Sequence, residues 1–188
     1  SSGFGSSIQN IGSIRNRGIE FNINGRLLST NDFSWDLLAN VSSNKNRVTS
    51  LAGGNDVFGV NGRGVIRVGE PLANFYDYVM DGIDQATGAI LYKDLDNNNV
   101  INSLDRKIIG YAEPDFIYGL TNNFSYKQFD LSLFIQGVQG NDLFDESFSV
   151  MANSMIRARN QVLDVYQHRW RPGHDNTHAK YPKISVVS

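Results

Sequence analysis

An aspartate- and asparagine-rich stretch carries the strongest chemical signal in this sequence. Residues 94–105 place oxygen-bearing side chains at loop positions 1, 3, 5, 9 and 12, and a backbone carbonyl at position 7. This is the ligand spacing of an EF-hand loop, in which alternate residues of a tight turn bring hard oxygens around one Ca²⁺ ion. The sequence therefore predicts a calcium loop with the ligands Asp94, Asp96, Asn98, Val100, Asn102 and Asp105.

Two positions of this loop depart from the EF-hand pattern. Asn99 replaces the usual glycine at position 6, although asparagine tolerates left-handed backbone geometry. Asp105 replaces the usual glutamate at position 12 and is one methylene shorter. Weak calcium binding that orders the loop is one hypothesis. The alternative is an Asx-rich turn whose side chains bond only their own backbone.

A set of aromatic residues lies in the same loop-rich region. Exposed rings there would stack on sugar rings or contact a protein partner, whereas buried rings would give a long loop its own small core. Both interpretations stay open for the candidate substrate or partner residues Phe58, Phe75, Tyr76, Tyr78, Tyr92 and Tyr111.

Other chemistry finds little support in the sequence. With no cysteine, thiolate catalysis, disulfides and Cys-ligated zinc are excluded. The glycines at 59, 62 and 64 lack the Lys-Ser/Thr of a phosphate loop, and a G-x-S-x-G nucleophile elbow is absent. The 17 basic and 19 acidic residues leave no basic footprint for nucleic acid. We therefore expect a protein that is not an enzyme and has no cofactor except, in the first hypothesis, Ca²⁺.

Period-two alternation defines the elements that must position these residues. Ile19, Phe21 and Ile23 alternate with polar residues, as do Phe33, Trp35, Leu37, Ala39 and Val41 in the next segment. The same pattern returns twice after residue 114, with Asn122 as a polar breach on one apolar face and Phe134 as an apolar breach on one polar face. The expected strands, in two antiparallel hairpins, are about 17–28, 33–42, 115–126 and 129–138.

The connections between these strands are strongly unequal. Short turns near 29–32 and 127–128 fall at one end, and a loop region over 43–114 falls at the other. Past Gly140 the apolar spacing becomes helical, which predicts an amphipathic helix near 142–170 inside a helical segment over 142–178. Transmembrane barrels have short periplasmic turns, long extracellular loops and strands of about 9–11 residues. We therefore place 43–114 and 142–178 on the extracellular side.

The order and spacing of many short motifs resemble one family. The chain is similar, over nearly all its length, to the C-terminal half of SusC/RagA-type TonB-dependent outer-membrane receptors of Bacteroidetes-like bacteria. The motifs that carry this resemblance are residues 10–20, 33–35, 44–48, 68–72, 75–76, 81–83, 94–110, 114–116, 118–119, 136–137, 140–142 and 169–170.

This resemblance implies a function and partners. Such a receptor is a transmembrane β-barrel with an N-terminal plug, is driven by TonB, and imports oligosaccharides or peptides across the outer membrane. It further implies a SusD-like surface lipoprotein as a lid and outer-membrane lipid around the strands. Because closed barrels start at eight strands, we expect the chain to be a fragment that lacks the plug and the TonB-contacting segment.

One alternative uses the same residues without a membrane. A secreted, calcium-stabilised β-sandwich that binds carbohydrate would show the same alternation. It requires the apolar strand faces to be buried against a second sheet of the chain, whereas a barrel presents them to lipid.

Overall fold

The computed structural model describes residues 10, 12–59, 63–152 and 160–184, and most of their regular structure is β-strand. The chain divides into two compact units. The first contains the residues up to Tyr76 together with Gly110–Asp142, and the second contains Asp77–Ile109 together with the residues from Leu143 onward.

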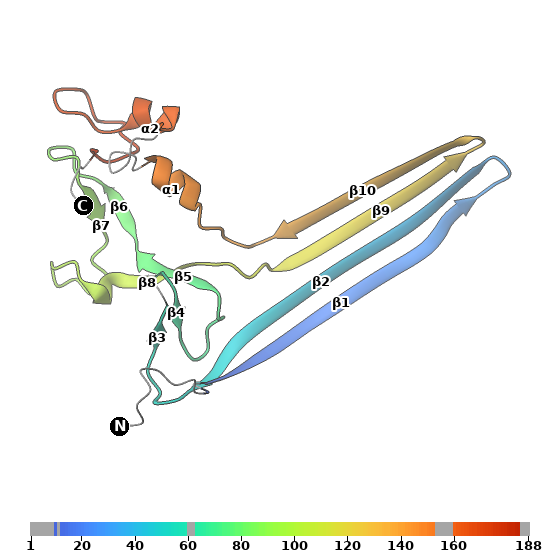
Figure 1. Ribbon diagram of the computed structural model, residues 1–188, viewed down its shortest axis with the longest axis horizontal. Helices are drawn as coiled ribbons and strands as arrows, with labels where there is room; N and C mark the ends of the chain where they lie inside the picture. Colours follow the sequence, from blue (N-terminus) through green and yellow to red (C-terminus); the bar gives the residue numbers. More distant parts are fainter. Residues whose placement is uncertain (1–9, 11, 60–62, 153–159, 185–188) are drawn as a thin grey trace, which may run out of the picture. The chain divides into compact units, whose positions relative to one another are not determined.

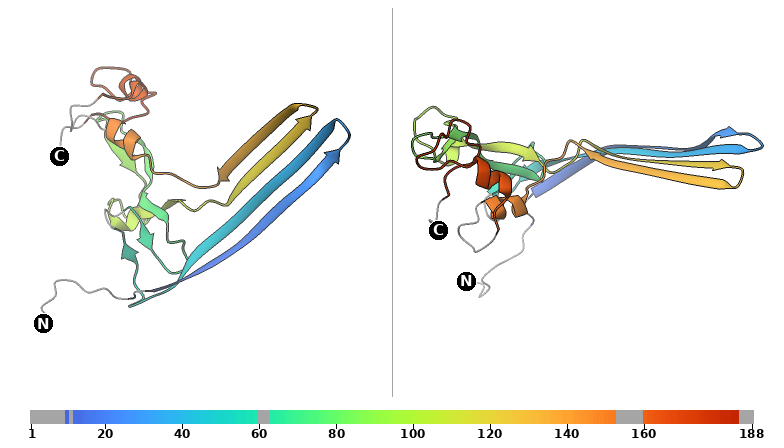
Figure 2. Two further views of the ribbon diagram at one scale, coloured as in Figure 1. Left: turned by 45° about the vertical axis from the view of Figure 1, so that its right-hand side comes forward. Right: turned by 90° about the horizontal axis from the view of Figure 1, so that it is seen from above.

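A four-stranded sheet forms the frame of the first unit. Its strand order is β1-β2-β9-β10, every neighbouring pair is antiparallel, and the four strands run side by side along their length (Figures 1 and 2). The antiparallel hairpins predicted from the alternation are therefore confirmed. The strands are β1 (Gly12–Ser29), β2 (Phe33–Leu51), β9 (Phe116–Tyr126) and β10 (Phe129–Gln139).

Both short hairpin turns lie at the same end of this sheet (Figure 1). Phe33 at the start of β2 pairs with Tyr126 at the end of β9. The backbone N–H of Lys127 also donates to the carbonyl of Asp32 at 2.8 Å, which ties one turn to the other. Lys127 has φ +53°, the left-handed geometry that tight hairpin turns favour.

Cross-strand pairing collects the alternating residues on two contrasting faces. We call the first the apolar face; it carries Ile19, Phe21, Ile23, Trp35, Leu37, Ala39, Val41, Leu120, Phe124, Leu131, Leu133 and Ile135. We call the opposite one the polar face; it carries Asn22, Asn24, Ser34, Asp36, Asn40, Thr121, Asn123, Ser125, Ser132 and Gln136.

The apolar face is open over most of its area. Ile19 is 79% exposed, Phe21 57% and Leu131 54%. A β-sandwich would bury these side chains against a second sheet, because burial of one apolar face is what holds two sheets together. The β-sandwich alternative therefore fails for this fold.

Two predicted boundaries in the first unit were wrong. β2 continues to Leu51, although the sequence interpretation ended it near 42 and assigned 43–51 to the loop region. β1 likewise begins at Gly12 instead of 17. Between Ser43 and Arg47 both faces of the extension are polar, so the hydrophobic alternation disappears there while the backbone ladder continues, from Gly18 opposite Asn44 to Ile14 opposite Val48.

The rest of the 43–114 region contains short strands instead of an uninterrupted loop. A small core forms around Val48 and Val65, which are 2% and 1% exposed. Asn74 is buried beside them, and its side chain bonds the N–H of Val65 at 3.1 Å and the carbonyl of Val65 at 2.8 Å. The short strands are β3 (Val57–Phe58), which pairs with β4 (Val65–Ile66), and β5 (Asn74–Tyr78), which pairs with β8 (Arg106–Tyr111).

The described residues of the second unit have little regular structure and form two short helices. Its elements are β6 (Met80–Ile83), β7 (Ile90–Tyr92), the 3₁₀ turn η2 (Ser103–Asp105), α1 (Glu146–Ala152) and α2 (Leu163–His168). The helical segment predicted over 142–178 is too long. Residues 169–178 form turns, because Arg169 pairs with Tyr181 and Pro172-Gly173 ends regular structure. Residues 153–159 of that prediction lie outside the described residues.

Candidate functional site

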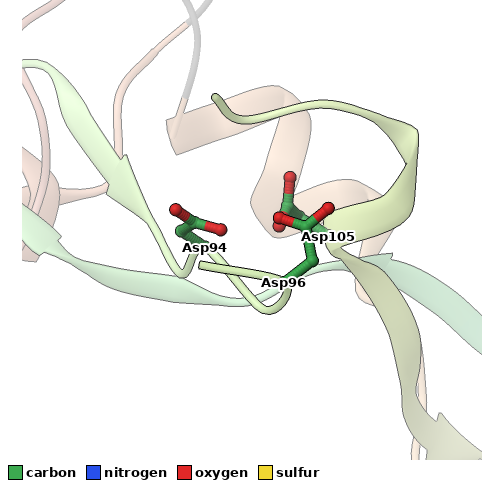
Figure 3. A group of neighbouring side chains, drawn as sticks. All are labelled: Asp94, Asp96 and Asp105. Carbon is green, nitrogen blue, oxygen red and sulfur yellow. The ribbon is translucent and has the colours of Figure 1, made fainter. Parts of the chain in front are cut away.

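The acidic loop lies wholly in the second unit, between β7 and β8. Each of Asp94, Asp96 and Asp105 brings a carboxylate oxygen within 4.8 Å of the other two (Figure 3). Asp105 is fully buried, whereas Asp96 is exposed. Three of the six predicted calcium ligands therefore converge from both ends of the loop.

Asp105 closes the loop through the backbone. One carboxylate oxygen accepts from the N–H of Leu95 at 2.7 Å, and the other accepts from the N–H of Asn102 at 2.8 Å. The side chain of Asn102 in turn accepts from the N–H of Leu104 at 2.9 Å, which completes a capping box on η2. The two ends of the loop are thus joined by one buried carboxylate.

The carboxylates of Asp94 and Asp96 hold the tip of the loop through backbone N–H groups, and Asp96 forms an Asx turn with Asn98. Asp94 accepts from the N–H of Asn98 at 3.2 Å and of Asn99 at 2.6 Å, and Asp96 also accepts from the N–H of Asn98 at 3.2 Å. Asn99 has φ +61°, the left-handed geometry expected at this position. The Asx turns of the alternative hypothesis are therefore present. These hydrogen bonds still leave carboxylate lone pairs available to a cation, because an ionised carboxylate has about four lone-pair sites.

The pKa values of half-buried Asp94 and exposed Asp96 are shifted in opposite directions. Burial raises the pKa of Asp96, and its hydrogen bond to Asp94 and the charge of Asp105 raise it further. Burial also opposes ionisation of Asp94, but hydrogen bonds from the backbone of Asn99 and Asn98 bring its pKa below the usual value. Ionisation of one carboxyl therefore disfavours ionisation of the other, and a bound divalent cation would stabilise the charged form of both.

The remaining predicted ligands are arranged less favourably. The side-chain oxygen of Asn98 accepts from the N–H of Val100 at 2.7 Å, and its amide donates to Asp96 at 2.8 Å. The carbonyl of Val100 accepts from the side chain of Asn102 at 3.1 Å. The donor set is made of hard oxygens that suit Ca²⁺. Calcium binding at this loop stays a prediction.

The six candidate aromatic residues are divided between the units, four in the first and two in the second. Phe58 and Tyr76 contact each other with ring centroids 5.7 Å apart, and Tyr76 is only 6% exposed. In the second unit, Tyr78 and Tyr92 contact each other at 5.4 Å. The hydroxyl of Tyr111 donates to Glu70 at 3.2 Å, and Phe75 is half-buried. Several of these rings therefore pack locally, and a role in substrate or partner binding stays a prediction.

A polar pair on the apolar face was missed by the sequence interpretation. Asn122 breaks the alternation of β9, and the indole N–H of Trp35 on β2 donates to its side-chain oxygen at 3.0 Å. Trp35 and Asn122 lie diagonally across neighbouring strands, since Trp35 pairs with Phe124 and Leu37 pairs with Asn122. The amide thus has a partner that only the strand register reveals.

Aromatic rings mark both ends of the apolar face. At the turn end, Phe124 contacts Phe33 at 6.4 Å and Trp35 at 5.6 Å. At the opposite end, Phe116 and Tyr118 lie 6.1 Å apart. Aromatic girdles at two levels flank the apolar band of transmembrane barrels.

A second cluster that sequence reasoning missed holds the last described segment to the second unit. The ring of Trp170 packs on Gly88, where an added Cβ would lie 2.5 Å from the ring, and its indole N–H donates to the carbonyl of Gln85 at 2.9 Å. Asp164 accepts from the hydroxyl of Tyr181 at 2.6 Å and lies 2.7 Å from Nδ1 of His168. The hydrogen bond from Tyr181 and the proximity of His168 outweigh burial and lower the pKa of Asp164.

The helices of the second unit are short. Among the described residues, no helix has the length and apolar character needed to cross a membrane.

An open antiparallel sheet with one exposed apolar face, aromatic ends and short turns on one side belongs to the class of transmembrane β-barrel walls. Solved structures agree on the fold. A structure of the RagAB peptide transporter matches 100% of this chain and 22% of that chain with a TM-score of 0.76 and 22% identity. A structure of the RagAB peptide importer in the open-open state matches 74% of this chain and 16% of that chain, with a TM-score of 0.63 and 26% identity.

Curated relatives identify the family. TonB-dependent receptor P3 of Formosa agariphila is 34% identical over 97% of this chain and 20% of its own length. TonB-dependent receptor SusC of Bacteroides thetaiotaomicron is 33% identical over 77% of this chain and 16% of its own length. No protein-family model matches the chain. The chain belongs to the SusC/RagA-type TonB-dependent receptors and spans about a fifth of the length of the curated relatives it matches.

Proposed function

We propose that this chain forms four adjacent wall strands and outer loops of a receptor that imports a nutrient across a Gram-negative, Bacteroidetes-type outer membrane. The imported substrate is an oligosaccharide or a peptide. Energy comes from TonB, which acts through a part of the receptor outside these 188 residues. A SusD-like surface lipoprotein covers the loop side.

The height of the apolar face is the observation that carries this proposal. Phe116 and Tyr126 lie at opposite ends of β9 on that face, ten residues apart (126 − 116 = 10). At about 3.4 Å per residue they span about 34 Å along the strand, or about 26 Å along the membrane normal for a tilt of about 40°. The apolar band of an outer-membrane barrel is about 25 Å tall, so this face matches the bilayer.

The direction of the strands supports an outward position for the loops. The turn after β1 and the turn after β9 are short and lie at one end, which is typical of the periplasmic side. The segment that connects β2 to β9 and the segment after β10 leave from the other end. These two segments contain the whole second unit, which supports an outward position for it, on the side from which we propose that substrate and a surface lipoprotein arrive.

Relatives support import and a peptide substrate. The RagAB structures are those of a peptide transporter and a peptide importer, and SusC is a TonB-dependent receptor. We extend import from those relatives to this receptor, whereas the oligosaccharide and the SusD-like lipoprotein are what the family resemblance implies. The choice between oligosaccharide and peptide is the outcome of an uptake assay.

A charge on the apolar face tests the membrane position directly. In the complete receptor, Leu133→Arg puts a cation near the middle of the apolar face and should destabilise the barrel by about 2–4 kcal/mol. Ser132→Arg on the polar face of the same strand is the matched control. We expect the first variant, and not the second, to lose assembly into the outer membrane. Equal assembly of both variants would contradict the proposed position.

Uptake tests the transport part separately. Cells that carry the complete receptor should accumulate a fluorescent oligosaccharide or a fluorescent peptide, and accumulation should stop when either the receptor gene or TonB is removed. Uptake that persists without TonB would refute the energy coupling. Copurification of a surface lipoprotein with the tagged receptor tests the partner.

A further inference from the structure

Four cations lie on the continuation of the apolar face away from the short turns. β1 and β2 continue as a two-stranded ladder beyond the row in which Ser42 pairs with Ile117 of β9 (Figure 1). In this continuation, the residues on the same face as Ile19 and Val41 are no longer apolar. We call the charged residues among them the basic patch; its members are Arg15, Arg17, Lys45 and Arg47.

The strand register sets these cations directly opposite one another. Arg17 pairs with Lys45, and Arg15 pairs with Arg47. All four residues are exposed. Like charges in opposite positions of two antiparallel strands are destabilising, so both rows disfavour the ladder unless an anion offsets their repulsion.

The chain itself offsets little of this positive charge. Nζ of Lys45 lies 2.7 Å from Oδ1 of Asp115, whereas Nη1 of Arg47 donates to a neutral backbone carbonyl at 2.8 Å. Among the described residues, the guanidinium groups of Arg15 and Arg17 have no hydrogen-bond or ion-pair partner. The basic patch therefore keeps a net positive charge that an external anion can neutralise.

The basic patch lies at the level of lipid headgroups. Arg17 is two residues beyond Ile19, the last apolar side chain of β1 on this face, and Arg15 is four residues beyond it. At about 3.4 Å per residue and a tilt of about 40°, the two arginines lie about 5 Å and about 10 Å outward of Ile19 along the membrane normal. The headgroup region adds about 5–8 Å to each side of the hydrocarbon core. The long side chains of both arginines can therefore reach lipid phosphates.

We propose that the basic patch binds the phosphate groups of an anionic lipid at the outer surface of the membrane. Guanidinium groups suit this ligand, because their planar fork binds two phosphate oxygens at once. The patch is continuous with the apolar face, so one lipid can lay its acyl chains along Ile19 and Phe21 while its phosphates meet the cations. A free phosphate ion or an acidic protein segment would use the cations alone. The inference rests on the proposed function, because it takes the apolar face as the lipid side.

Native mass spectrometry of the complete receptor in a neutral detergent tests the lipid chemistry. The probe is phosphatidic acid, which carries a phosphate monoester, and phosphatidylcholine is the zwitterionic reference. We expect retention of phosphatidic acid, and Arg15→Gln/Arg17→Gln should weaken it at least about tenfold. Arg26→Gln/Lys127→Gln removes the same charge near the turn end of the sheet and is the matched control. Equal loss in both double variants, or equal retention of the two lipids, would overturn the inference.

Competition distinguishes a lipid from a free phosphate ion. Inorganic phosphate shares the charge of the headgroup but has no acyl chains. We expect bound phosphatidic acid to persist in the presence of millimolar inorganic phosphate. Its complete displacement would overturn the assignment to a lipid.

Photo-crosslinking in cells separates failure of this inference from failure of the proposed function. p-Benzoylphenylalanine replaces Arg17 in one complete receptor, which leaves three cations in place, and Phe21 in another. We expect both positions to crosslink to lipid, and the lipid captured at 17 to contain phosphate. A polypeptide or no product at 17, together with lipid at 21, would overturn the inference alone. A polypeptide captured at 21 would instead defeat the membrane position.

Discussion

The hydrogen bond between Trp35 and Asn122 gives the sharpest quantitative test of this sheet. The indole N–H of Trp35 donates to the amide oxygen of Asn122 at 3.0 Å on the face assigned to lipid. Trp35→Phe keeps an aromatic ring but removes the donor, which leaves the amide oxygen without its partner. An unsatisfied buried acceptor costs about 1–3 kcal/mol, whereas polar pairs within membranes average about 0.6 kcal/mol and reach about 1.7.

A double-mutant cycle isolates this hydrogen bond from the packing of the indole. Asn122→Leu removes the acceptor and adds an apolar side chain, but it leaves the indole N–H of Trp35 without its partner, so by itself it should have a small net effect. Trp35→Phe should cost about 1–2 kcal/mol when Asn122 is present, and clearly less in the Asn122→Leu background. The coupling energy of the pair is therefore expected at about 0.6–1.7 kcal/mol.

The assay is reversible unfolding of the complete receptor in lipid vesicles by urea or guanidinium, followed by tryptophan fluorescence and by heat-modifiable gel mobility. Two probes are needed because Trp35 is itself a fluorophore. Phe33→Leu provides the control, since it changes a neighbouring ring of the same aromatic cluster without touching the hydrogen bond. A coupling energy near zero, or a stabilising Trp35→Phe, would refute the reasoning that Asn122 depends on Trp35.

Four further predictions concern the loops and the isolated chain. Calorimetric titration should show Ca²⁺ binding by the 94–105 loop at up to millimolar concentration, and Asp96→Asn or Asp105→Asn should weaken it; no calcium heat from the unmodified protein would defeat the hypothesis. Because the pKa of Asp96 is raised in the folded loop, this carboxyl stabilises the cation-free loop at low pH, and the stabilisation is lost as the pH rises through the pKa of the folded state. Calcium should therefore protect the loop from hydrogen exchange more at pH 7 than at pH 4. Gly88→Ala should destabilise the second unit, because the φ of Gly88 is +71° and the new methyl group would lie 2.5 Å from the Trp170 ring. Gly173→Ala is the control, since Gly173 also has a positive φ but has open space around it. An equal loss of protease resistance in both variants would argue against the Trp170 contact. The 188-residue chain should aggregate in buffer and become discrete only in detergent micelles by size exclusion with light scattering, and a compact monomer in plain buffer would contradict an exposed lipid face.

Much of the sheet follows from local pattern. Ile19, Phe21 and Ile23 alternate with polar residues, and the same holds for Leu131, Leu133 and Ile135, because successive side chains of a strand point to opposite faces of the sheet. The ends of the strands do not follow from it. Between Ser43 and Arg47 both faces of β2 are polar, so its continuation depends on pairing with β1 and leaves no trace in hydrophobicity.

The candidate calcium loop shows a similar division. The alternating Asp and Asn residues predict an oxygen-rich turn, and the φ of +61° at Asn99 agrees with the geometry expected at that position. The spacing of the residues does not predict that Asp105 is fully buried, because that burial goes with its hydrogen bonds to the backbone of Leu95 and Asn102 across the loop. Nor does spacing show how the aromatic residues pair, since Phe58 meets Tyr76 through contacts between separate short strands.

Asn122 and Phe134 show most clearly what each level determines. By itself the sequence determined the strands, their short and long connections, and the fact that these two residues break the alternation, because such patterns are local along the chain. Only the tertiary structure decided that Asn122 meets the indole of Trp35, and that Phe134 joins Leu38, Ile117 and Val138 around Gly119. The physical reason is register: β2 and β9 are far apart in sequence, and the register in which the two strands pair determines which of their side chains become neighbours.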